Sequence, residues 1–126
     1  MSYRIMQNRK NKTVTLHFTA NATVVIAGDE NTSNIALPGE VITGAHIRQA
    51  WYGTPSGAVA YWRVSRGANT VAVLDSTSYT DFAGNGNAIT LDQDATLTAS
   101  LVGSPEGYLI VELQKIGEFT SEYFAG

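Results

Sequence analysis

Alternation of apolar and polar residues over short segments constrains this chain more than any other feature of its sequence. Between residues 12 and 18 every second residue is apolar, namely Val14, Leu16 and Phe18. A period of two places alternate side chains on opposite faces of a β-strand, one of them buried. The same period recurs at residues 96–101 and 108–114, and no segment up to residue 115 shows a helical period over eleven or more positions. The sequence therefore predicts an all-β fold.

Further strand-like segments lie at residues 24–26, 46–52, 58–65 and 70–74, with shorter ones at 79–82 and 88–91. Turn residues such as Gly, Asn and Pro separate them. About nine short strands with closely spaced turns are typical of a β-sandwich or jelly roll. A single sheet would leave one apolar face in water, so two sheets must pack face to face. We expect one antiparallel β-sandwich or jelly-roll domain over residues 1–126.

Two hairpins are predicted within this sandwich. One pairs residues 58–65 with 70–74, and the other pairs 96–101 with 108–114 around the turn sequence at 103–107.

The two ends of the chain, residues 1–12 and 117–126, lie outside the clearest alternation and are expected to form extended arms. The N-terminal arm is basic. It contains all the cations of the first 28 residues, Arg4, Arg9, Lys10 and Lys12, and this stretch contains no acid. One interpretation is an arm that docks on an acidic partner; the other is a solvated terminus whose charges prevent unwanted strand pairing. Nucleic acid is not expected as a partner, because the rest of the chain carries all 11 acids.

The C-terminal arm is aromatic. Phe119, Tyr123 and Phe124 lie within six residues of one another. Leaving three such rings in water is unfavourable, so they either fold back over their own sandwich or pack on another subunit.

Two aromatic pairs, Trp51–Tyr52 and Tyr61–Trp62, occupy predicted strands that we expect to be neighbours in one sheet. Adjacent residues of a strand face opposite ways, so each pair should place one ring in the core and one outside. The outer rings could form a platform for stacking sugars or a contact between subunits.

Candidate catalytic and metal-binding residues are few. The chain has no Cys, which excludes disulfides, thiolate metal sites and a cysteine nucleophile. Its two histidines, His17 and His46, lack the spacing of a metal site. Asp92 and Asp94 form a close pair, but turn-forming residues surround them. Ser56 is not the centre of a nucleophile elbow. We expect no enzyme activity, no metal and no cofactor.

No apolar run approaches the roughly 18 residues that a membrane helix needs, so no membrane partner is expected. The segment before residue 13 has no apolar stretch typical of a secretion signal. Secretion through a cleaved signal is therefore not expected.

The whole chain resembles small structural proteins of tailed bacteriophage virions, which are rich in Thr, Ser, Gly and Asn and lack Cys. The resemblance is carried by the strands 58–65 and 70–74, the segment 103–107 and the two arms. Among these proteins the chain looks most like capsid decoration, or cement, proteins. This implies a homotrimer that is synthesised in the host cytoplasm and lies on the capsid surface of a virion. There it would bridge neighbouring copies of the major capsid protein, with residues 2–12 gripping the capsid.

Two other functions remain open. The aromatic pairs would suit a carbohydrate- or receptor-binding module of a phage fibre or tail. A hydrolase on a sandwich scaffold would need Asp92, Asp94 or another acid to face a second carboxylate across a cleft.

Overall fold

The computed structural model describes residues 3–54, 59–75, 77–82, 84, 89, 93–103 and 106–117. Within these ranges the chain forms strands and no helix, so it contains no helix that could cross a membrane. The strands are β1 (Tyr3–Asn8), β2 (Thr13–Phe18), β3 (Ala22–Val24), β4 (Ile42–Gly53), β5 (Tyr61–Arg66), β6 (Asn69–Asp75), β7 (Ser78–Asp81), β8 (Leu97–Val102) and β9 (Tyr108–Gly117).

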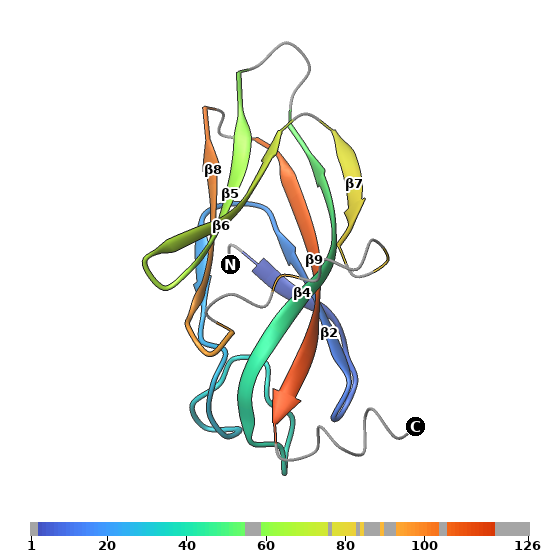
Figure 1. The fold of residues 1–126 in the computed structure, drawn as a ribbon, viewed down its shortest axis with the longest axis vertical. Coiled ribbons are helices and arrows are strands. Elements are labelled where there is room, and N and C mark those ends of the chain that lie inside the picture. Colours follow the sequence, from blue (N-terminus) through green and yellow to red (C-terminus); the bar gives the residue numbers. More distant parts are fainter. Residues whose placement is uncertain are drawn as a thin grey trace.

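The strands form two antiparallel sheets that pack face to face. One sheet has five strands in the order β1-β2-β9-β4-β7, and the other has four in the order β3-β8-β5-β6. In Figure 1, β8, β5 and β6 lie on the left and β9, β4 and β7 on the right. The predicted antiparallel β-sandwich is confirmed.

The core lies between the sheets and follows the alternation in the sequence. In β2, every second side chain is buried, whereas the Thr and His side chains between them are half-buried on the outer face. The opposite sheet contributes Trp62, Val64, Leu97 and Ala99, all at most 2% exposed. Full burial of one large apolar side chain stabilises the fold by about 1.5–3 kcal/mol, so the alternating residues account for why these segments become strands.

One of the two predicted hairpins is confirmed and the other is wrong. β5 and β6 pair directly. β8 pairs with β3 and β5, however, while β9 pairs with β2 and β4 in the other sheet. Gly103 follows β8 directly and has a φ of 90°, and a Cβ there would collide with the carbonyl oxygen of Val59. Alternation shows which face of a strand is buried but does not show which strand lies beside it.

The predicted N-terminal arm is, over most of its described length, the edge strand β1. It pairs with β2, and Tyr3 packs on the ring of Phe18 with 5.6 Å between the ring centroids. A bulge between Ile5 and Gln7 and the exposure of the middle of β1 remove the alternation that would reveal this strand. Of the predicted C-terminal arm, residues 117–126, only Gly117 is described, and it is the last residue of β9. Residues 118–126, with Phe119, Tyr123 and Phe124, lie outside the described residues.

Candidate functional site

Three of the four cations predicted for the arm lie together on the turn that joins β1 to β2. Arg9, Lys10 and Lys12 are all exposed. The turn is closed by a hydrogen bond of 2.8 Å from the Arg9 N–H to the Thr13 carbonyl. Asn11 has a φ of 59°, a left-handed conformation that Asn tolerates better than most residues. We call residues 9–12 the basic turn.

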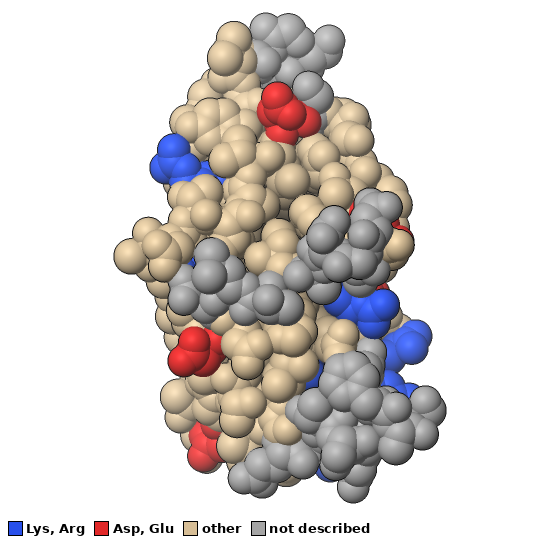
Figure 2. Space-filling model, viewed as in Figure 1, with Lys and Arg blue, Asp and Glu red and all other residues tan. Residues whose placement is uncertain are grey.

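The fourth cation, Arg4, is separate from this group. It precedes Arg9 by five residues, about 16 Å along an extended chain, and lies opposite His17 in the pairing of β1 with β2. In Figure 2 most Lys and Arg atoms gather on the lower right of the molecule, on the side where β2 lies in Figure 1, and the acids are scattered elsewhere.

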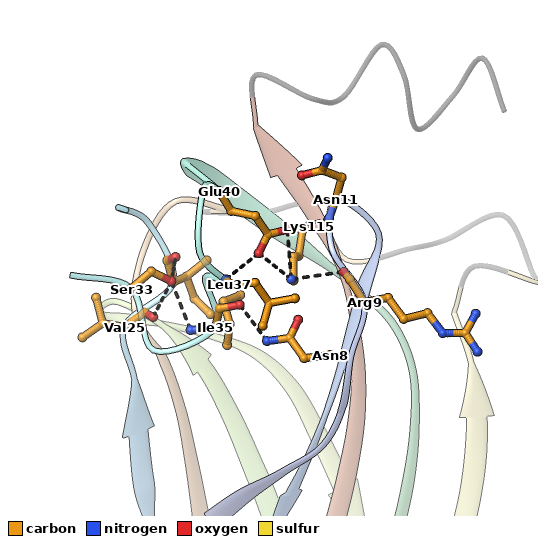
Figure 3. A network of polar contacts seen from close by, with 10 residues as sticks. Asn8, Arg9, Asn11, Val25, Ser33, Ile35, Leu37, Glu40 and Lys115 are labelled. Carbon is orange, nitrogen blue, oxygen red and sulfur yellow. Dashed lines mark hydrogen bonds and ion pairs between the residues drawn. The ribbon is translucent and has the colours of Figure 1, made fainter. Parts of the chain in front are cut away.

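A buried ion pair lies beneath the basic turn (Figure 3). The side chains of Lys115 and Glu40 are both fully buried, and the Lys115 Nζ lies 2.8 and 3.1 Å from the two Glu40 carboxylate oxygens. The carboxylate also accepts backbone hydrogen bonds from Asn11 (2.5 Å) and Leu37 (2.6 Å). The Lys115 Nζ in turn donates to the Arg9 carbonyl at 3.2 Å. The pair therefore fixes both the backbone of the turn and the loop that precedes β4.

Burial lowers the pKa of Lys115 below its ordinary value, and the hydrogen bond and charge of Glu40 oppose this shift. An ion pair in a low-dielectric interior is tolerated only when its remaining hydrogen-bonding groups find partners. Here the backbone of the turn supplies them. In Figure 3 the Arg9 side chain points away from this network, so its charge is presented outward on a fixed backbone.

A second surface runs across the outer face of the five-stranded sheet. Strand register places one outward residue of each strand side by side, and we call this set the cross-strand row: Arg4 (β1), His17 (β2), Ile110 (β9), Trp51 (β4) and Tyr79 (β7). Neighbouring strands are about 4.8 Å apart, so the row spans about 19 Å.

The β7 end of the row is aromatic and its rings are held in place. The centroids of Trp51 and Tyr79 are 5.1 Å apart, with 31° between the ring planes. The Tyr79 hydroxyl donates to the Gln49 Oε1 at 2.7 Å. Partial burial, followed by the nearby charges of Asp81 and Glu112, raises the pKa of Tyr79 above its ordinary value.

A third ring, Tyr108, lies over Gly53, its partner on β4. A Cβ at residue 53 would come within 2.9 Å of the Tyr108 Cζ, so the ring occupies the space that a side chain there would fill. Beside it is a hollow of about 390 Å³ lined by Met6, Thr15, Trp51, Tyr108 and Ile110. Glycine at this position lets the ring rest on the sheet.

The predicted burial of one ring in each aromatic pair is confirmed, but the predicted proximity of the two pairs in one sheet is wrong. Tyr52 and Trp62 are buried, while Trp51 and Tyr61 are half-buried, so each pair places one ring in the core. The pairs are not neighbours, because Trp51 and Tyr52 lie on β4 and the other two on β5 of the opposite sheet. Tyr61 instead contacts Arg63 on the outer face of the four-stranded sheet.

The sequence contains signals for several residues of these surfaces that the predictions missed. Tyr108 and Ile110 occupy outward positions of an alternating strand, where apolar residues are unexpected. Lys115 continues the inward positions of the same strand, and a lysine there requires a buried partner. Nothing in the sequence identifies that partner as Glu40.

The described residues contain no group of three or more His, Cys, Asp or Glu that could hold a metal ion. His46 is hydrogen-bonded to Gln93, with 2.5 Å between the Nε2 and Oε1 atoms. Asp94 is exposed in a turn, whereas Asp92 and Ser56 lie outside the described residues.

Comparisons of the chain with protein-family models, curated proteins and solved structures gave no match.

Proposed function

We propose that this protein is a non-enzymatic structural protein of a virion, which decorates and stabilises the capsid by bridging neighbouring copies of the major capsid protein. The observation that supports this is the basic turn, whose three cations are exposed on a backbone fixed by the Glu40–Lys115 pair. A surface that is already ordered loses little conformational entropy when it binds. Charge complementarity with an acidic coat surface would speed docking and orient it.

The proposed assembly is a homotrimer on the capsid surface. One basic turn makes few contacts, and several turns related by symmetry would act together through their effective concentration. The acids in the rest of the chain disfavour binding to nucleic acid, which is why a protein partner is proposed.

The test uses capsids of the encoding virus that were assembled without this protein. The unchanged chain should sediment with the capsids and should be released as salt is raised. Arg9→Glu and Lys10→Glu should each weaken attachment at least about tenfold, or about 1.4 kcal/mol. Arg63→Glu makes the same change of charge on the outer face of the four-stranded sheet and is the matched control, which should attach normally. Equal attachment of Arg9→Glu and Arg63→Glu, or no attachment of the unchanged chain, would contradict the proposal.

A second candidate function, a carbohydrate- or receptor-binding module of a phage fibre or tail, is favoured by the exposed rings. Tyr79 and Tyr108 are 46% and 39% exposed beside Trp51. A chain that binds glycans and does not bind capsids would have this function instead.

A further inference from the structure

The cross-strand row has different chemistry at its two ends. Its aromatic end borders the hollow beside Tyr108, and its basic end borders a second hollow of about 450 Å³ lined by Tyr3, Arg4, His17 and Thr19. His17 lines the second hollow and is the register partner of Ile110, which lines the first. Residues of β1 and β2 line both hollows, so the two lie next to each other on the same sheet.

The aromatic end suits the apolar face of a sugar ring. The face of an aromatic ring carries partial negative charge, which attracts the C–H groups on one side of a pyranose. Tyr108 rests over Gly53 and Trp51 contacts Tyr79, so these rings are already ordered and lose little freedom on binding. The Gln49 Oε1 accepts the hydrogen bond from Tyr79, so the amide N–H groups of Gln49 can donate to a sugar hydroxyl.

The basic end suits a carboxylate. Arg4 is exposed and has no ion-pair partner among the described residues. A guanidinium can donate two parallel hydrogen bonds to a carboxylate. The imidazole of His17 lies on the same face, because its neighbours Leu16 and Phe18 are buried. Among the described residues, the acids on this face of the sheet, Glu112 and Asp81, lie on β9 and β7 and not on β1 or β2, and Glu112 is 3.9 Å from Arg48.

The length of the row indicates how large a ligand would be. Arg4 and Trp51 are separated by three steps between strands, about 14 Å. One pyranose ring is too short to reach both, whereas two or three linked rings can. We propose that the cross-strand row binds an acidic oligosaccharide, with the carboxylate of one sugar at Arg4 and His17 and a neighbouring ring stacked on Trp51 and Tyr108.

This site is independent of capsid attachment. The basic turn lies at the end of β2 that begins at Thr13, whereas the row crosses β2 at His17, near the other end. A virion protein held by its turn could therefore still present the row outward.

The experiment is a calorimetric titration of the full chain with three probes: sialyllactose, trigalacturonic acid and neutral lactose. We expect each acidic probe to bind at least about tenfold more tightly than lactose. The two acidic probes distinguish a sialic acid from a uronic acid as the source of the carboxylate. Arg4→Gln should reduce the affinity for the acidic probes to that for lactose, whereas Arg63→Gln, the matched change on the other sheet, should leave it unaltered.

Substitutions at the aromatic end complete the test. Trp51→Ala should abolish binding of all three probes, and Trp51→Phe, which keeps a ring and the fold, should weaken it about threefold to tenfold. Arg9→Glu should retain saccharide binding and Arg4→Gln should retain capsid attachment, so the two proposals fail separately. Absence of binding by the unchanged chain, equal affinity for acidic and neutral probes, or equal effects of Arg4→Gln and Arg63→Gln would overturn the inference.

Discussion

The basic turn and the cross-strand row belong to the same sheet but are held in place in different ways. The row is fixed by strand register, since each of its residues is the direct partner of the next. The turn is fixed from beneath by Glu40 and Lys115, which are 75 residues apart in the sequence. The row is thus positioned by the backbone pairing of five strands, whereas the turn depends on a buried side-chain pair in addition to its backbone hydrogen bonds.

This difference determines how each surface should respond to substitution. Replacing Lys115 alone should loosen the basic turn and lower the stability of the chain. The same substitution should leave the cross-strand row in place, because the pairing of five strands positions its residues.

The largest effect is expected from Lys115→Met, which leaves the Glu40 carboxylate buried without its cation. Removing one partner of a buried ion pair costs about 3–5 kcal/mol. The free energy of unfolding, measured with urea, should fall by this amount. The double variant Glu40→Gln with Lys115→Met removes both charges and should recover most of the loss. Lys12→Met, an exposed lysine of the same turn, should change stability by less than about 0.5 kcal/mol. If Lys115→Met unfolds no more easily than Lys12→Met, the buried pair does not support the turn.

Much of the fold could be predicted from the sequence because burial and alternation are local properties. Val14, Leu16 and Phe18 are fully buried, as their spacing indicates. The sheet to which each strand belongs could not be predicted, since β8 and β9 follow one another along the chain but lie in different sheets. β1 was missed because an edge strand with a bulge buries too few side chains to show a period.

The candidate surfaces were predictable only in part. The charges of Arg9, Lys10 and Lys12 are visible in the sequence, but their anchoring by Glu40 is not. The outward ring of Trp51 follows from its buried neighbour, whereas its contact with Tyr79 depends on the pairing of β4 with β7. Long-range pairing is the information that a single sequence lacks.

An intermediate effect is expected from Asn11→Ala, which tests the backbone of the basic turn. Asn11 has a φ of 59° and donates its N–H to Glu40. A left-handed conformation costs an ordinary residue about 1–2 kcal/mol, so Asn11→Ala should lower the free energy of unfolding by about that amount. Asn11→Gly, which adopts this conformation without strain, should lower it less. Equal losses in the two variants would mean that backbone conformation at this position is not the cause.

The smallest effect on stability is expected from Gly53→Ala, which acts on Tyr108 beside the cross-strand row and leaves the pairing of the strands unchanged. The added Cβ would overlap the Tyr108 ring, which is exposed enough to swing away. Stability should therefore change by less than about 1 kcal/mol, because no core contact is lost. The ring would leave the surface beside Trp51, so the chemical shifts of its protons should change and saccharide binding should weaken.

Tyr108→Phe, the control, keeps the ring on Gly53 and should retain binding. If Gly53→Ala binds saccharide as well as the unchanged chain, the placement of Tyr108 is irrelevant to recognition and the row acts through Trp51 and Tyr79 alone.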